Sequence, residues 1–308
     1  MVKKIIVSMT TIPSRKERLK ENIFSILNQS VSFDKLVINI DDNLSKDDYK
    51  WYKKFAKISD KIIFNKASAK WRSCNKLLPT LLLFPDDVII TIDDDVYYPV
   101  DCFKYLLEQH TKTPGYIVSH EVNPILIENN FITYLNSYDI KVNQFQWGKY
   151  LSNCCLFPPH VFDGTDLMDY DKMMACTKGT HDELWFWVNS TLNKVKCVGL
   201  NYIRTFAYDV KRNWSADEYR LTHINEKQDS IDDYMKEINK MYGTRLIENI
   251  NNDKVVFVLN KDNVGQFCAS IKYIKLLYSY GFSIKSDGLT SGWIKTVEDV
   301  IDGSEFKY

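Results

Sequence analysis

The first 112 residues alternate between short apolar runs and segments whose apolar side chains recur at helical spacing. Apolar runs of about four to eight residues bounded by polar residues are typical of buried strands, and a spacing of three or four residues is typical of amphipathic helices. Strands separated by helices form βαβ units, which build a largely parallel sheet. The expected strands are 3–9, 35–40, 61–65 and 87–92, and the expected helices are 14–29, 45–58, 73–84 and 99–112.

Several residues in these segments predict where helices begin or bend. Ser14 and Glu17 have the spacing of a capping box, so Ser14 is the expected N-cap of the first helix. Pro99 is expected at the start of the fourth helix, where a missing N–H costs little. Pro79 is expected to kink the third helix.

The pattern changes after residue 113. We expect a short strand at 115–120, an irregular region at 121–165, and an acidic helix start followed by an aromatic helix and a strand at 179–200. A further helix is expected at 229–243. From Lys254 a small βαβα appendage follows, with strands at 254–260 and 282–286 around a helix at 264–280, and a last segment at 297–303. The expected domains are 1–250 and a small α/β accessory segment, or the start of a further domain, at 251–308.

Charge and cysteine content restrict the class of protein. Forty basic residues balance forty acidic ones, and no basic stripe is present, so nucleic acid is not an expected partner. The seven cysteines contain no CxxC pair, which favours reduced thiols in the cytoplasm. No apolar run reaches the length of a membrane-spanning helix. A soluble protein is expected, and peripheral contact at the inner face of the membrane stays open.

Three consecutive carboxylates, Asp93, Asp94 and Asp95, follow the expected strand 87–92. Adjacent carboxylates repel one another, and a divalent cation removes this cost. Hard oxygen ligands favour Mg²⁺ or Mn²⁺, which commonly take one or two carboxylates together with substrate phosphates. In an extended segment Asp93 and Asp95 would point to the same side. These two are therefore the expected metal ligands, and Asp94 could reach a ribose or sugar hydroxyl.

The stretch "TIDDDVYYP" resembles the DXD motif of glycosyltransferases with the GT-A fold. The stretches "VSMTTIPSRKERLKENIFSILNQS" and "KLVINIDD" resemble the nucleotide-binding half of bacterial capsular and surface polysaccharide members, and "LFPPHVF" and "HDELWFWVNSTLN" resemble two later blocks of that group. The resemblance spans roughly residues 3–240. It implies a Rossmann-like nucleotide-binding half around a mixed central sheet, a nucleotide-diphosphate sugar donor and a divalent metal, most often Mn²⁺, with Mg²⁺ as the alternative.

The same resemblance implies roles for individual residues on the donor side. The loop after the first strand should contact the nucleotide, Asp41 or Asp42 the base or ribose, and Lys76 the pyrophosphate. The segment 210–216 could be a lid. The residues expected to bind the nucleotide sugar are Thr10, Thr11, Pro13, Arg15, Asp41, Asp42, Lys76, Asp93, Asp94, Arg212 and Trp214.

On the acceptor side, the resemblance makes Asp182 the catalytic base and Glu183 its fallback. From the residues alone, Asp182 would be a helix N-cap and Glu183 would be favoured by the helix dipole. His223 or His181 could supply a third metal ligand beside Asp93 and Asp95.

The predicted function is metal-dependent transfer of a sugar, most likely from a UDP-sugar, to a glycan acceptor, with inversion, in surface polysaccharide biosynthesis. The acceptor would be an oligosaccharide or a lipid-linked glycan. Two alternatives stay open. One is a sugar-1-phosphate nucleotidyltransferase, which usually carries a glycine-rich loop that "SMTTIPSR" lacks. The other is a non-catalytic glycan-binding protein on the same fold.

Overall fold

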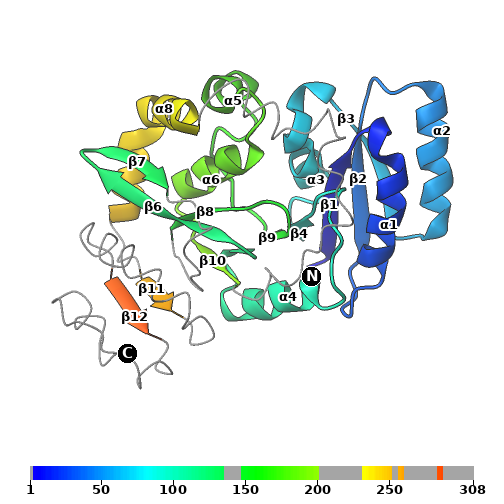
Figure 1. Ribbon diagram of the computed structural model, residues 1–308, viewed down its shortest axis with the longest axis horizontal. Coiled ribbons are helices and arrows are strands. Elements are labelled where there is room, and N and C mark those ends of the chain that lie inside the picture. Colours follow the sequence, from blue (N-terminus) through cyan, green and yellow to red (C-terminus); the bar gives the residue numbers. More distant parts are fainter. Residues whose placement is uncertain (1–2, 135–146, 201–230, 252–255, 260–282, 287–308) are drawn as a thin grey trace, which may run out of the picture.

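A mixed seven-stranded sheet organises the molecule. The computed structural model describes residues 3–134, 147–200, 231–251, 256–259 and 283–286 (Figure 1). The strand order is β10-β5-β9-β4-β1-β2-β3, and β9 runs antiparallel to both of its neighbours, while the other pairs are parallel. The strands are β1 (Ile5–Thr11), β2 (Lys35–Asp41), β3 (Ile62–Ala67), β4 (Val88–Thr91), β5 (Ile117–Ser119), β9 (Cys155–Phe157) and β10 (Cys197–Gly199).

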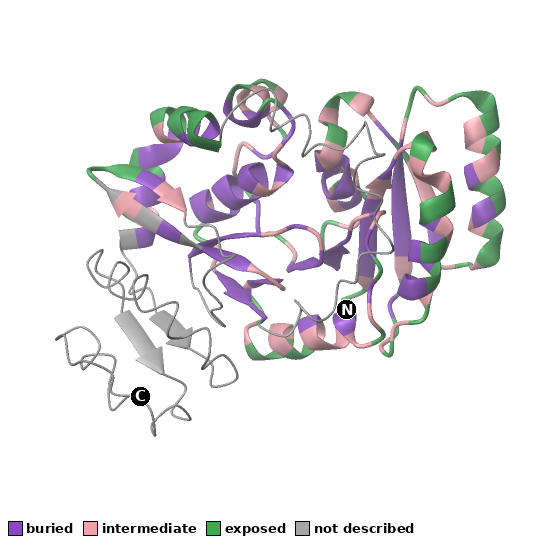
Figure 2. Cartoon of the chain, in the orientation of Figure 1, coloured by how far each residue is buried: buried purple, intermediate pink, exposed green. Residues whose placement is uncertain are grey.

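Helices cover both faces of this sheet. Successive strand residues point to opposite faces, and in β1 the buried Ile6 and Val7 accordingly enter different apolar clusters. The Val7 cluster includes side chains of α1, α2 and α4, and the Ile6 cluster includes those of α3, α5, α6 and α8. Figure 2 shows buried strands between helices with exposed outer faces. The helices are α1 (Lys16–Leu27), α2 (Lys46–Phe55), α3 (Leu78–Leu83), α4 (Cys102–Lys112), α5 (Tyr170–Thr177), α6 (Asp182–Leu192) and α8 (Ile231–Asn251), with 3₁₀ turns η1 (Pro13–Arg15), η2 (Ala56–Ile58) and η3 (Ala69–Lys76).

The helix starts differ from the expected ones. Ser14 is not an N-cap, because it lies inside the 3₁₀ turn η1, which the Arg15 N–H closes on the Ile12 carbonyl; α1 starts two residues later without a side-chain cap. Pro79 lies in the first turn of α3 and kinks nothing, because the break falls at Leu77 before it. Pro99 precedes α4 in a turn, where its carbonyl accepts the Cys102 N–H.

The expectation of an irregular region at 121–165 is wrong. Three strands there form a small antiparallel sheet, in the order β7-β6-β8. Asn129 and Asn130 both have positive φ, as a two-residue hairpin turn between β6 and β7 requires. Apolar alternation predicts strands this short poorly, because they offer only a few residues to the pattern. The strands are β6 (Val122–Glu128), β7 (Phe131–Tyr134) and β8 (Gly148–Tyr150).

The C-terminal part is described in pieces. Helix α8 confirms and extends the expected helix at 229–243, and its Ile238, Tyr242 and Leu246 are buried in the same apolar cluster as α5 and α6. Strands β11 (Val256–Leu259) and β12 (Ser283–Ser286) pair in parallel as a separate sheet, which confirms the two expected strands. The expected segments 264–280 and 297–303 lie outside the described residues. The division at residue 250 stays a prediction.

Within the described ranges, no helix is both long and apolar enough to cross a bilayer.

Candidate active site

The candidate site lies at the sheet edge where the parallel strands end. Strand β1 pairs in parallel with β2 and β4, so Thr11, Asp41 and Thr91 end their strands at a common edge. Strand β9 runs the opposite way, which brings the residues before it to this edge; the Thr91 hydroxyl donates to the Ser152 carbonyl at 2.6 Å. Ligands commonly bind at this edge of open α/β sheets. The antiparallel direction of β9 thus places Ser152, which is distant in sequence from β4, at the expected ligand-binding edge.

The three aspartates form a turn and not the extended segment that we expected. Strand β4 ends at Thr91, and residues 94 and 95 lie in a turn. The Asp93 N–H donates to the Tyr98 hydroxyl at 2.8 Å, and the Asn22 amide donates to the Asp93 carbonyl at 3.0 Å. These two side chains bend the backbone directly after the strand. The three carboxylates therefore reach different partners.

The buried Asp94 carboxylate connects the acidic turn to Thr11 and Arg15. It accepts hydrogen bonds from Arg15 and from the Thr11 hydroxyl, each at 2.6 Å, and the residue is 3% exposed. Burial raises the pKa of Asp94, although Arg15 acts against this rise. Arg15 also lies 3.7 Å from Asp95. Three of the predicted donor-binding residues are thus close together, and their polar groups hold the loop after β1 against the acidic turn.

We expect Asp94→Asn to destabilise the fold by about 3 kcal/mol, because it leaves the Arg15 charge without its main partner in a largely buried position. Equilibrium unfolding in urea measures this change. Asp95→Asn is the matched control, since Asp95 lies 3.7 Å from Arg15, compared with 2.6 Å for Asp94, and sits beside like charges. Its unfolding free energy should stay within about 0.5 kcal/mol of wild type. Equal losses for both variants would contradict a specific role for Asp94.

The Lys76 ammonium joins two carboxylates that are far apart in sequence. Its Nζ lies 2.6 Å from Asp93 Oδ1 and 3.2 Å from Asp182 Oδ2, and it donates to Ser152 Oγ at 3.3 Å. The Lys76 side chain is 9% exposed. Burial alone would lower the pKa of Lys76, but Asp182 and then Asp93 raise it above its usual value. The lysine is therefore charged, and it is buried between two carboxylates instead of being a solvated helix lysine.

Asp182 is the first residue of α6 and does not cap it. The N-cap position belongs to His181, whose side chain makes no capping bond. The Asp182 carboxylate instead accepts from the Ser152 hydroxyl at 2.8 Å and pairs with Lys76. Burial alone would raise the pKa of Asp182, but Lys76 and then Ser152 hold it below its usual value. Asp182 is therefore an ionised, buried carboxylate at the sheet edge.

A second buried lysine neutralises the neighbouring acid. Lys149 Nζ lies 2.6 Å from Glu183 Oε2 and 5.3 Å from the centre of the Tyr134 ring. Sequence reasoning missed both Lys149 and Ser152. Lys149 lies in a strand of three buried residues, and a lysine between Trp147 and Tyr150 was a signal for a buried charge. Nothing in the sequence around Ser152 points to Asp182.

The other predicted residues lie around this cluster or outside the described ranges. Thr10 Oγ1 donates to the Asn39 carbonyl, Pro13 begins η1, and Asp42 accepts from the Ala69 N–H. Burial, followed by the charge of Asp42, raises the pKa of Asp41. The His181 ring packs 4.9 Å from the Tyr234 ring. Arg212, Trp214 and His223 lie outside the described residues.

The acidic turn suits a divalent cation that also holds a phosphate. In the described part of the chain, no three His, Cys, Asp or Glu side chains gather as a metal site. Two carboxylates are nevertheless sufficient for Mn²⁺ or Mg²⁺ when substrate oxygens complete the coordination shell. Burial raises the pKa of Asp93; Lys76 opposes this, and the charge of Asp95 adds to it. Asp93 and Asp95 thus form a pair of like charges that a cation would stabilise.

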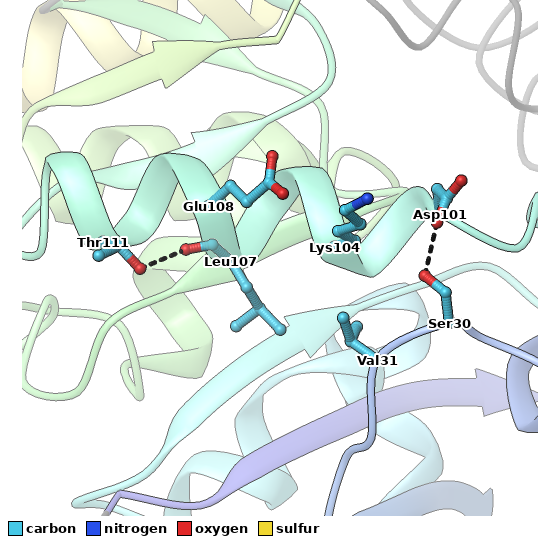
Figure 3. Close-up of a pocket in the computed structure, with 7 residues that line it drawn as sticks. All are labelled: Ser30, Val31, Asp101, Lys104, Leu107, Glu108 and Thr111. Carbon is cyan, nitrogen blue, oxygen red and sulfur yellow. Dashed lines mark hydrogen bonds between the residues drawn. The ribbon is translucent and has the colours of Figure 1, made fainter.

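A separate pocket of about 440 Å³ lies along α4 (Figure 3). Its polar rim includes the hydrogen bond from Ser30 Oγ to Asp101 Oδ1 at 2.6 Å. No residue predicted for the candidate site lines this pocket, so it adds nothing to the functional argument. The lining residues are Ser30, Val31, Asp101, Lys104, Leu107, Glu108 and Thr111.

Solved structures of one known protein are similar to this chain in fold. The S. aureus protein TarS, residues 1–349, in complex with UDP-GlcNAc is similar over 96% of this chain and 77% of its own, with a TM-score of 0.52 and 13% identity. Its complex with UDP aligns over 90% and 72%, with a TM-score of 0.49 and 12% identity. No curated protein matches the chain.

The expected GT-A fold is confirmed, and the protein is a glycosyltransferase. The chain belongs to glycosyl transferase family 2, whose model matches residues 9–167. The matched segment contains the acidic turn and ends before Asp182.

Proposed function

We propose that the enzyme transfers a sugar from a UDP-sugar to a glycan acceptor, with inversion and with a divalent cation, in surface polysaccharide synthesis. The observation that carries this proposal is the Lys76 ammonium, which lies between Asp93 and Asp182. The same ammonium thus contacts a carboxylate that would bind the metal and a carboxylate that would act as the base. A donor held at the first could then meet an acceptor activated at the second.

On the donor side, Asp93 and Asp95 would hold Mn²⁺ or Mg²⁺. The bound cation would stabilise negative charge on the leaving diphosphate. Arg15 and Lys76 are the described cations next to this turn. Thr10 and Thr11 end β1 and Asp41 ends β2, while Pro13 and Asp42 follow these strands. A nucleotide would contact these residues at the sheet edge, and Arg212 and Trp214 stay proposed as lid residues. The UDP-GlcNAc bound to TarS supports a UDP-sugar as the first donor to test.

On the acceptor side, Asp182 would remove the proton from the attacking hydroxyl. An ionised carboxylate at the edge of the donor site suits general-base catalysis. Direct attack on the anomeric carbon inverts its configuration and needs no nucleophile from the enzyme. Glu183 stays the fallback, although it is paired with Lys149. His181 or His223 stays a possible third metal ligand.

The setting of the reaction is also proposed. An oligosaccharide or lipid-linked glycan would be the acceptor, and the enzyme would act in the cytoplasm, with peripheral contact at the inner membrane face. Residues 251–308 would form an accessory segment.

We expect the purified protein to release UDP from one member of a UDP-sugar panel when Mn²⁺ is present, and to release little when EDTA removes the cation. Coupled detection of free UDP measures this slow hydrolysis. Melting temperatures with each nucleotide sugar, with and without Mn²⁺, report binding separately, because a ligand that binds only the folded state raises them. Pyrophosphate release from UTP and a sugar phosphate would favour the nucleotidyltransferase. No turnover and no binding would favour a glycan-binding protein.

A further inference from the structure

Lys76 holds the position of a counter-ion for both functional carboxylates. Asp93 belongs to the acidic turn, and Asp182 is the first residue of α6. The Lys76 ammonium lies within 3.2 Å of each carboxylate. The side chains of Lys76 and Asp182 are less than 10% exposed, and that of Asp93 is 29% exposed. Water therefore screens these interactions weakly.

The backbone of Lys76 is firmly placed beneath this cluster. The Ser8 hydroxyl contacts both the Lys76 carbonyl and the Thr80 hydroxyl at 2.6 Å, and the Asn39 amide donates to the same Thr80 hydroxyl at 3.0 Å. All four residues are buried. This polar network joins β1, β2 and η3, so the ammonium can shift only through its own side-chain torsions. A new partner at Asp93 would therefore change the position of the Lys76 ammonium relative to Asp182.

A divalent cation and the Lys76 ammonium would compete for the same carboxylate. A cation coordinated by Asp93 repels a positive charge lying 2.6 Å from that group. We propose, on the basis of the proposed function, that Lys76 is a positioning residue that acts as the counter-ion of the acidic turn. Lys76 sets the affinity of this turn for divalent cations and couples the turn to Asp182. By linkage, each partner of Lys76 affects the binding of the other.

This coupling gives opposite effects for two charge-removing variants. Lys76→Met removes the competitor, so Mn²⁺ should bind the nucleotide-free protein about tenfold more tightly. Asp182→Asn leaves Asp93 as the main partner of Lys76, so Mn²⁺ should bind about tenfold more weakly. A tenfold change corresponds to about 1.4 kcal/mol, which is less than the Coulomb energy of two unit charges about 4 Å apart near a protein surface. Titration calorimetry with Mn²⁺ alone measures both affinities.

The double variant separates coupling through Lys76 from general electrostatics. If Asp182 acts through Lys76, Asp182→Asn should change the Mn²⁺ affinity less than about threefold in the Lys76→Met background. An equal effect in both backgrounds would overturn the proposal. Lys149→Met is the matched control: it also removes a buried lysine paired at 2.6 Å, but with Glu183, and it should change the affinity less than about threefold.

Loss of folding in the lysine variant does not prevent the test. Lys76→Gln keeps a hydrogen-bond donor without the charge, and it should also bind Mn²⁺ more tightly. Asp182→Asn alone, in the wild-type background, would overturn the proposal if its Mn²⁺ affinity were unchanged. Wild-type protein that binds no Mn²⁺, with or without UDP, would instead refute the metal dependence in the proposed function.

Discussion

Asp182→Asn is expected to reduce sugar transfer by about 10²–10⁴-fold, the usual contribution of a general base. At saturating Mn²⁺, binding of the nucleotide sugar should stay within about threefold of wild type. Asparagine has nearly the same shape and can still accept the Ser152 hydrogen bond, but it cannot take a proton from an acceptor hydroxyl. Transfer rates with the identified donor and acceptor measure the loss, and melting temperatures with UDP confirm an intact donor site.

Glu183→Gln is the control for this prediction. Glu183 is the next residue of α6, but its carboxylate is paired with Lys149 at 2.6 Å. We expect a rate reduction of less than about tenfold, because Lys149 lies closer to Glu183 (2.6 Å) than Lys76 lies to Asp182 (3.2 Å) and would hold the Glu183 carboxylate more tightly. A wild-type rate for Asp182→Asn would show that the base is misassigned. A larger loss for Glu183→Gln would move the role to the fallback residue.

Asp95→Ala is expected to abolish Mn²⁺-dependent binding of the donor, with affinity falling at least about 100-fold. Among the described residues, the cation paired with Asp95 is Arg15 at 3.7 Å, whereas Asp93 and Asp94 each have a cation at 2.6 Å. The Asp95 carboxylate is therefore the one available to a metal at little cost. A ligand at about 100 times its Kd stabilises the folded state by about 2.7 kcal/mol. The increase in melting temperature caused by UDP and Mn²⁺ should accordingly disappear.

The melting temperature without ligand distinguishes this effect from misfolding. Removing Asp95 relieves like-charge repulsion with Asp93, so the ligand-free variant should melt within a few degrees of wild type. Asp86→Ala is the matched control, because its side chain is 82% exposed and lies before β4, at the opposite end of that strand. Donor binding by Asp95→Ala with unchanged Mn²⁺ dependence would contradict the assignment, as would a structure with Mn²⁺ and UDP bound away from Asp93 and Asp95.

The sequence predicted the elements whose signals are local. Strands β1 to β4 and their helices were found because a buried strand and a helix face each repeat over enough residues to show their period. The strands β6, β7 and β8 were missed. In β8, three buried residues include a lysine, which interrupts any apolar pattern. Whether such a segment is a strand depends on pairing with a partner elsewhere in the chain.

Candidate residues were predictable to the extent that they follow strands or lie in a stretch that resembles the family. Asp93, Asp94 and Asp95 were predicted because they follow an expected strand, and parallel strands place their ends at one edge. Asp182, which begins α6, was predicted only from the resemblance to GT-A glycosyltransferases. The hydrogen-bond and ion-pair partners that differ from one aspartate to the next could not be predicted from the sequence. Asp94 is held by Arg15 and Thr11, whereas Asp93 shares Lys76 with Asp182.

The amino-acid order by itself determined the alternation of strands and helices and the position of the carboxylates along the chain, because periodicity and turn chemistry act between near neighbours. Only the tertiary structure decided which carboxylate meets which cation. The antiparallel strand β9 brings Ser152 to the end of β4, and α6 starts beside it. Hydrogen bonds and ion pairs act over a few ångströms, so the roles of these groups are set by neighbours in space that lie far apart in the chain.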